Sequence, residues 1–455
     1  MSNHFTTGRQ SWFQILFAPV LYAFSFYGYA LTLYLPVIFY LPSQLFTIPY
    51  RMIALVCPLY AIYCVMQKGY RMYNGKLLVL LMLFWGAYVL RIFFEHMSGE
   101  PLPRSITFYY QMAIGVSAIP MIPFLLNHSK SALRSAFWSL ALTAVVCVTV
   151  NFALYGVSLG GVTGRAKGGE MIDGVVALGP LLMAYLGSAI IVLGIFAAMA
   201  SSFFAPLGRP AGNNPELGIV ERWILYLPSL MIPAPMRPVI FRFGVSAALL
   251  LGGAYLLVMG ASRGPVLSIA ACGFILMLSR IHQPSHIFRA LGLLVLMGLL
   301  GALALYLSSL AGSGFAYRIL GVFNAMEEIQ YGNADYGRYF IWLDAIDAIC
   351  ANPVFGSGLF LESTGTYPHN AILECYMALG IVGGTLYVII LLSCVRVAWR
   401  ILRKAPECGW VSLLFIHYAV YVQLSSSIIV NHYFWCSAAA VIGVDHMLRT
   451  QGQQR

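Results

Sequence analysis

Residues 371–393 read AILECYMALGIVGGTLYVIILLS, and this stretch indicates the fold class. It holds one charged residue, Glu374, in a run longer than the roughly 20 apolar residues that cross a bilayer as a helix. The chain of 455 residues shares this character, because it is 60% hydrophobic and only 9% charged. Soluble domains carry about a quarter charged residues. The sequence therefore predicts an integral membrane protein and argues against a soluble enzyme, a coiled coil or a nucleic-acid-binding domain.

Apolar runs of this kind recur along the whole chain and predict an all-α polytopic membrane protein with about 12 transmembrane helices. Lys and Arg concentrate in alternate connections, which the positive-inside rule assigns to the cytoplasm. By the same rule both termini are expected to be cytoplasmic. The predicted spans lie near residues 12–35, 47–67, 76–94, 105–126, 135–155, 173–200, 240–260, 265–279, 290–309, 371–393, 410–429 and 433–448.

Residues 1–455 are expected to form a single membrane domain with two long connections. Residues 201–239 are predicted on the cytoplasmic side and contain GIVERWILYL, which is typical of an interfacial amphipathic helix. Residues 310–370 are predicted to form a large periplasmic loop that carries amphipathic helices and six of the 15 acidic residues. Loops of this length in compact proteins are usually functional, so we expect the chemistry on the outer face.

The placement of the charges bears on two other classes of function. An ion-coupled transporter usually places ionisable residues near the middle of the membrane, whereas nearly every charge here falls at a span end or in a connection. His417 is the main exception, and we predict that it is a hydrogen-bonded packing residue. The net charge of +11 indicates anionic lipid headgroups or an anionic lipid-linked substrate as partners rather than nucleic acid.

Two arginines are candidates for binding an anion on the outer face. Arg263 occupies a turn of a few residues between two predicted spans, where a guanidinium held at fixed depth suits bidentate phosphate binding. Alternatively, Arg263 snorkels at a helix end. Arg338 opens a predicted amphipathic helix that ends at Asn352-Pro353, and its structural alternative is an ion pair with Asp335.

The segment Tyr367-Pro368-His369-Asn370 supplies a candidate base at the start of the span 371–393. Asn370 is predicted to cap that helix. His369 would then lie at the membrane surface, where an imidazole can accept a proton near neutral pH; alternatively it is an interfacial histidine beside a cap. The residues GGVTGRAKGG at 160–169 lack the spacing of a phosphate-binding loop. No pair of cysteines has the spacing of zinc ligands, so neither a metal nor a cofactor is expected.

Taken together, these residues resemble the O-antigen ligase and O-antigen polymerase family of bacterial membrane glycosyltransferases. From His369-Asn370 the chain runs nine residues to Gly380 and two more to Gly383, which is the His-Asn-x9-Gly-x-x-Gly pattern associated with the ligases. The Ser-Arg-Gly at 262–264 matches another landmark. A third is the run of Arg338, Trp342, Pro353 and Gly358, in the order of the family.

The resemblance implies an enzyme of lipopolysaccharide biosynthesis in the bacterial inner membrane, with a periplasmic active site. It would transfer a glycan from undecaprenyl pyrophosphate to a hydroxyl of lipid A–core, without a metal and with inversion. Arg263 and Arg338 would bind the pyrophosphate and His369 would activate the acceptor. Two alternatives stay open, namely an O-antigen polymerase that extends the carrier-linked glycan, and a flippase or exporter of that glycan. Supporting candidates are Asn370, Arg165, Lys167 and Arg318.

Overall fold

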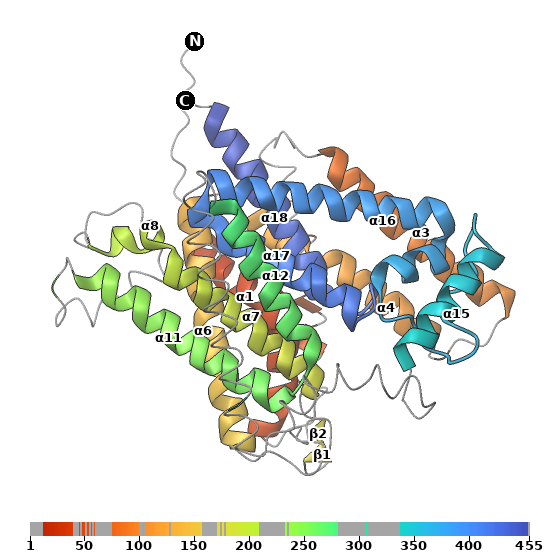
Figure 1. Ribbon diagram of the computed structural model, residues 1–455, viewed down its shortest axis with the longest axis horizontal. Helices are drawn as coiled ribbons and strands as arrows, with labels where there is room; N and C mark the ends of the chain where they lie inside the picture. Colours follow the sequence, from red (N-terminus) through yellow and green to blue (C-terminus); the bar gives the residue numbers. More distant parts are fainter. Residues whose placement is uncertain are drawn as a thin grey trace.

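The computed structural model shows a protein built almost entirely of α-helices (Figure 1). It describes residues 12–39, 75–99, 105–126, 129–156, 179–208, 236–280 and 337–453, together with isolated residues and one short strand pair. That pair consists of β1 (Met171–Ile172) and β2 (Val175–Val176), which run antiparallel. Apart from this pair, the described elements confirm the helical fold class.

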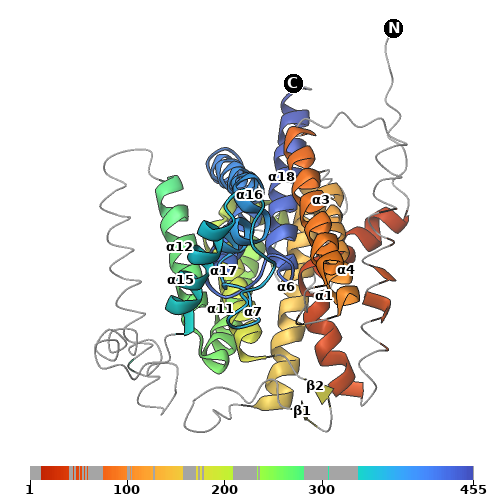
Figure 2. The same cartoon turned by 90° about the vertical axis from the view of Figure 1, so that its right-hand side faces the viewer.

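The helices follow the predicted apolar runs along the chain, and Figure 2 shows α12, α6, α3 and α18 running in roughly the same direction. In chain order they are α1 (Trp12–Phe39), α3 (Gly75–Ser98), α4 (Ile106–Ala118), α5 (Met121–Leu126), α6 (Lys130–Tyr155), α7 (Pro180–Met199), α8 (Ser201–Phe204), η1 (Ala205–Gly208), α11 (Arg237–Gly260), α12 (Arg263–Arg280), α15 (Gly337–Ala351), α16 (Ala371–Lys404), η4 (Pro406–Cys408), α17 (Gly409–Leu424) and α18 (His432–Gln453).

Among the described residues, six helices are long and apolar enough to cross a membrane, which confirms a membrane protein. They comprise Val79–Ser98, Lys130–Leu154, Pro180–Met199, Arg237–Gly260, Arg263–Arg280 and Ala371–Lys404. The total of about 12 spans stays a prediction. The predicted spans 47–67 and 290–309 and the predicted interfacial helix at 218–227 lie largely or wholly outside the described residues.

Helix α7 lies at the centre of the bundle and is buried along most of its length. It packs against α11, where the Ser246 hydroxyl donates a hydrogen bond of 2.9 Å to the Gly194 carbonyl. It also packs against α17, where Ser188 Oγ lies 3.4 Å from Nε2 of the fully buried His417. His417 is therefore a hydrogen-bonded packing residue, as the sequence predicts.

Three predicted spans have different bounds in the structure. The run 105–126 forms two helices, α4 and α5, and the break falls at Pro120, because proline has no N–H to donate to a helix. Within the run 173–200, the described helix begins at Pro180, and the strand β2 precedes it. Helix α17 ends at Leu424, and residues 425–431 form a connection to α18.

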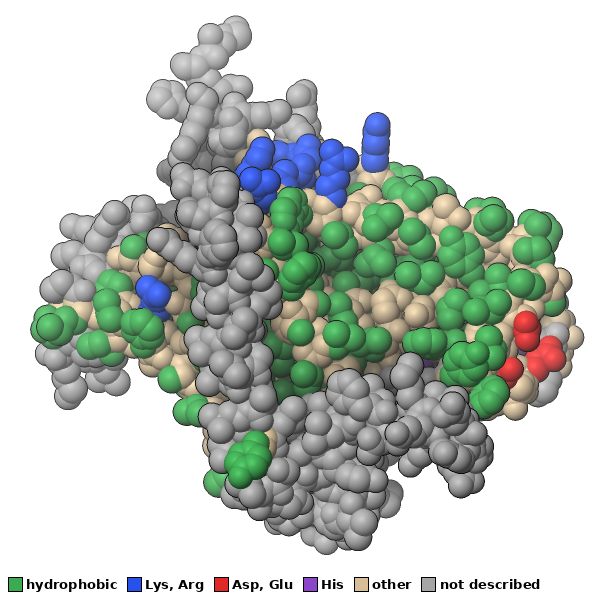
Figure 3. Space-filling view, in the orientation of Figure 1, with side chains coloured by type: hydrophobic (Ala, Val, Ile, Leu, Met, Phe, Trp, Pro, Cys, Tyr) green, Lys and Arg blue, Asp and Glu red, His purple; other side chains and the backbone are tan. Residues whose placement is uncertain are grey.

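The charged side chains gather at separate edges of the face seen in Figure 3, with a mostly hydrophobic surface between them. Most Lys and Arg lie along the upper edge and another basic group lies at the left, whereas Asp and Glu lie at the right, where Figure 1 draws α15. At the basic end, Asp445 pairs with Arg400 and, at 2.9 Å, with Arg449. Lys130 pairs with Glu407 at 2.7 Å. This separation is the pattern expected of a protein whose apolar middle lies in a bilayer.

Candidate active site

The turn before α16 places His369 in an uncommon backbone conformation. Oδ1 of Asn370 accepts hydrogen bonds from the N–H groups of Ile372 at 3.0 Å and Leu373 at 3.1 Å, so Asn370 caps the helix as predicted. His369 has a φ of +55°, in the left-handed region that few non-glycine residues adopt. Its ring is partly exposed, its Nδ1 atom is buried, and it contacts the Tyr367 ring edge-on at 4.6 Å.

A polar contact holds helix α15 against this turn. The Trp342 indole N–H donates a hydrogen bond of 2.9 Å to the Pro368 carbonyl, one residue before His369. Arg338 lies in the first turn of α15, four residues before Trp342. The Arg338 side chain lies outside the described residues. The helix from Gly337 to Ala351 matches the one predicted to open near Arg338 and end at Asn352-Pro353.

Arg263 is the first residue of α12, directly after the turn that ends α11. Ala261 caps α11 with φ 40° and ψ 52°, which reverses the chain within two residues. Arg263 is exposed, as a tight turn between two spans predicts. The next residue is Gly264, where a Cβ would overlap the hydroxyl group of Tyr185. Glycine at this position therefore lets α12 begin directly against α7.

The connection between α17 and α18 joins the beginnings of α12 and α16. The Tyr185 hydroxyl, which touches Gly264, donates a hydrogen bond of 3.3 Å to Ser425 Oγ. Two residues further on, Ser427 Oγ donates a 2.6 Å hydrogen bond to Glu374 in the first turn of α16. The Ile428 N–H donates to the other oxygen of the same carboxyl group at 3.0 Å. The helix ends that carry Arg263 and His369 are therefore both held by the 425–428 connection, the first of them through Tyr185.

Glu374 is a supporting residue that the sequence analysis noted only as a charge at a span end. Its side chain is fully buried, and the Tyr88 hydroxyl of α3 lies 3.5 Å from its Oε1. Three elements thus meet on one carboxyl group at the start of α16. A lone acidic residue inside an apolar span is a sequence signal that could have identified it.

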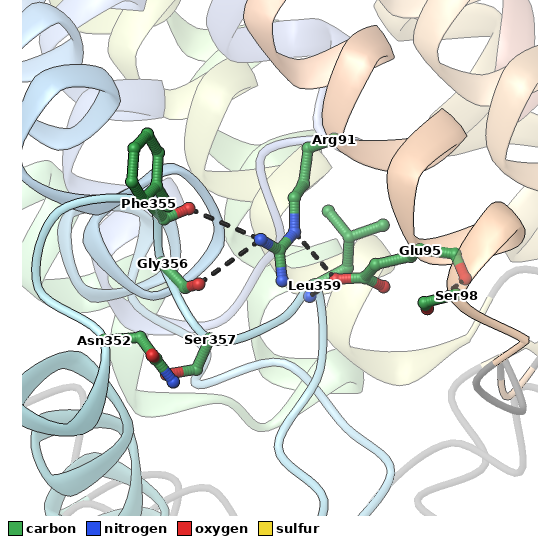
Figure 4. A network of polar contacts seen from close by, with 8 residues as sticks. All are labelled: Arg91, Glu95, Ser98, Asn352, Phe355, Gly356, Ser357 and Leu359. Carbon is green, nitrogen blue, oxygen red and sulfur yellow. Dashed lines mark hydrogen bonds and ion pairs between the residues drawn. The ribbon is translucent and has the colours of Figure 1, made fainter.

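A second supporting network ties the loop after α15 to α3 (Figure 4). Arg91 lies 3.0 Å from Glu95 and donates hydrogen bonds of 3.3 Å to the carbonyl groups of Phe355 and Gly356. Glu95 in turn accepts a 2.6 Å hydrogen bond from the Leu359 N–H. Neither Arg91 nor Glu95 could be predicted as a site residue, because nothing near them in the chain indicates a partner that lies 264 residues away.

The glycines of the His-Asn-x9-Gly-x-x-Gly pattern lie at a kink in α16. Gly380 has φ 63° and ψ −163°, which interrupts the helix, and a Cβ there would overlap the Val354 carbonyl oxygen. At the break, the Ile381 N–H donates a 2.8 Å hydrogen bond to the Pro353 carbonyl. The kink therefore gives the loop after α15 a place to dock on α16. This docking also fixes α15 beside the His369 turn.

The electrostatic character of these helix ends suits an anion. Helices α12 and α16 both begin here, and a helix N-terminus carries a partial positive charge. At α16 the N–H groups of Ile372 and Leu373 already donate to Asn370. The Arg263 guanidinium adds a full charge at the start of α12. The imidazole of His369, at the start of α16, is a group that can accept a proton. The two helix ends therefore supply a cation that can bind a phosphate-like group and a group that can act as a base.

The remaining candidates cannot be placed. Arg165, Lys167 and Arg318 lie outside the described residues. Within the described ranges, no three His, Cys, Asp or Glu side chains form a group that could hold a metal ion.

The fold and these helix ends define an integral membrane protein with a basic, imidazole-bearing candidate site. The family model for O-antigen ligase matches residues 247–388. This match confirms the resemblance to the O-antigen ligase family and implies a glycosyltransferase-like enzyme. The matched segment contains Arg263, Arg338 and His369. A comparison with curated proteins finds no match.

Proposed function

We propose that the protein is an O-antigen ligase of lipopolysaccharide biosynthesis. It transfers a glycan from undecaprenyl pyrophosphate to a sugar hydroxyl of lipid A–core at the periplasmic face of the inner membrane. The observation that carries the proposal is the meeting of the Arg263 and His369 helix ends on the 425–428 connection, within a fold whose 247–388 segment matches the family.

Arg263 and Arg338 bind the pyrophosphate of the donor in this proposal. The bond between the anomeric carbon and the pyrophosphate oxygen breaks through an oxocarbenium-like state, and negative charge grows on the leaving group. Guanidinium groups and helix N-termini stabilise such a charge, and donors aimed at developing charge are typically worth 10²–10³ in rate. Because pyrophosphate leaves readily, the reaction needs no general acid, and the arginines do the work that a divalent metal does in other enzymes.

His369 acts on the acceptor. As the acceptor oxygen forms its bond to the anomeric carbon, the hydroxyl proton passes to the imidazole of His369. A single displacement of this kind inverts the anomeric centre. The cap at Asn370 and the contact between Trp342 and the Pro368 carbonyl hold the turn in which His369 lies.

The test is transfer by purified protein in EDTA, with carrier-linked glycan and lipid A–core as substrates. We expect wild-type protein to transfer the glycan, and His369→Ala to lose about 10²–10⁴ in rate, the usual contribution of a general base. Arg263→Ala is expected to fail as well. His96→Ala, which removes an exposed histidine at the end of α3, is the matched control and should keep the wild-type rate.

Each other outcome contradicts a defined part of the proposal. Longer glycans that stay on the carrier would make the protein a polymerase. Full activity of His369→Ala would refute its role as base. Loss of transfer in EDTA that Mg²⁺ restores would refute the metal-independent reaction. Movement of carrier-linked glycan across vesicles without any new glycosidic bond would make the protein a flippase.

A further inference from the structure

Helix α15 carries an exposed apolar stripe on the side away from the rest of the protein. The stripe consists of Tyr339, Leu343, Ile346 and Cys350, which recur every three or four residues and so lie on one face. Tyr339 is 60% exposed and Ile346 is 44% exposed. Figure 1 places α15 at one end of the molecule, next to the start of α16.

Packing on the opposite face of α15 fixes this stripe outward. Ala345 is fully buried in a small cluster with Leu361 and Met377, the latter from α16. Trp342 is anchored to the Pro368 carbonyl from the same packed side. Because both contacts hold the helix in one rotation about its axis, the stripe cannot turn inward without breaking them.

The stripe continues into the lipid-facing surface of a membrane span. After α15, the loop exposes Phe355 by 82%, and this loop docks on the α16 kink through the hydrogen bond between Ile381 and Pro353. At that point α16, a candidate span, exposes Ile381 by 56% and Val382 by 70%. The lipid-facing side of a span contacts the hydrocarbon core of the bilayer. An apolar surface that is continuous with that side is expected to contact the hydrocarbon core as well.

The face of α15 next to the stripe carries acidic residues together with Phe340, which is 54% exposed. Asp344 and Asp347 lie there, and Ser363 Oγ donates a 2.7 Å hydrogen bond to Asp344. A helix that packs on one face and exposes apolar residues beside acidic ones on the other can lie at the interface of a bilayer. Its acidic flank would face headgroups and water, while its stripe would face acyl chains.

We propose that α15 and the turn at 352–355 are seated in one leaflet of the bilayer, with the stripe among the acyl chains. The leaflet is the one on the side of the start of α16, against which α15 packs. This membrane contact is independent of the reaction that the site performs. It sets the depth of the His369 turn, since Trp342 of α15 holds that turn.

Spin labels on adjacent positions of α15 test this seating in proteoliposomes. Ile346→Cys and Asp347→Cys are each made in a background with Cys57, Cys64 and Cys350 replaced by serine, and each is given a nitroxide. The other cysteines are buried. We expect the label at position 346 to collide several-fold more with O₂ than with a water-soluble nickel chelate. Position 347, the matched control, should show the reverse preference.

Two results would overturn the proposal. If the label at position 346 prefers the nickel chelate, the stripe faces water. If it is shielded from both reagents, a second copy of the chain or another protein segment covers it. A second measurement requires no substitution on α15: a fluorophore on the native Cys350, with Cys57 and Cys64 replaced by serine, should be quenched by lipids brominated on their acyl chains. Absence of that quenching counts against the seating.

Discussion

Replacing Gly380 with alanine tests whether the kink in α16 holds the candidate site together. The backbone at φ 63° and ψ −163° is nearly exclusive to glycine, and another residue there costs about 1–3 kcal/mol. The new methyl group would also overlap the Val354 carbonyl oxygen, and overpacking of this kind costs about 1–3 kcal/mol. Gly380→Ala should therefore lower the free energy of unfolding by about 2–6 kcal/mol, or straighten α16 and release the docked loop.

Thermal unfolding of the detergent-purified protein, followed by tryptophan fluorescence, measures the loss of stability. The rate of glycan transfer reports whether α16 has straightened and released the docked loop. Gly86→Ala is the matched control, because Gly86 lies within α3 with open space where a Cβ would be, and alanine favours a helix by up to about 1 kcal/mol. If Gly380→Ala unfolds at the same temperature as the wild type and transfers glycan at the wild-type rate, the kink does not support the site.

Three further predictions follow from other contacts. Arg91→Met should cost about 3 kcal/mol, the loss expected when one partner of a buried ion pair is removed; Lys130→Met, which breaks an exposed pair, should cost less than about 1 kcal/mol in the same denaturation assay. Asn370→Ala should cost about 1 kcal/mol as a lost helix cap, and Asn370→Ser should recover most of it; equal melting of both variants would contradict the capping role. In intact spheroplasts at pH 8, a membrane-impermeant maleimide should label Asp347→Cys, made with Cys57, Cys64 and Cys350 replaced by serine, if the acidic flank of α15 is periplasmic. Burial raises the pKa of the Cys408 thiol to about 12, so only about one molecule in ten thousand would carry a reactive thiolate there; labelling of position 347 only after the spheroplasts are lysed would refute the assignment.

Local signals in the sequence predicted the helices and their ends well. The cap at Asn370, the turn at Ser262-Arg263-Gly264 and the start of α15 near Arg338 depend on neighbouring residues, and the structure places them as predicted. Pro120 was equally visible in the sequence, but the hydrophobicity of residues 105–126 outweighed it, and one span was predicted where two helices form.

Contacts between distant segments could not be predicted in this way. Gly380 was recognised as part of a pattern, yet its kink depends on the Val354 carbonyl from the preceding loop. Glu374 finds its partners on the connection after α17, and Arg91 finds its partners far along the chain. A single sequence carries no record of such pairings, because each depends on how helices pack rather than on spacing along the chain.

The carboxyl group of Glu374 has a consequence for protein engineering. The segment that matches the family ends at residue 388, but Glu374 is held by Ser427 and Ile428 beyond it and by Tyr88 well before it. The segment is therefore not a transplantable module. A chimera that exchanges only residues 247–388 between two such enzymes would leave this carboxyl group facing foreign partners. A graft that also carries α3 and the hairpin of α17 and α18 would move the complete set.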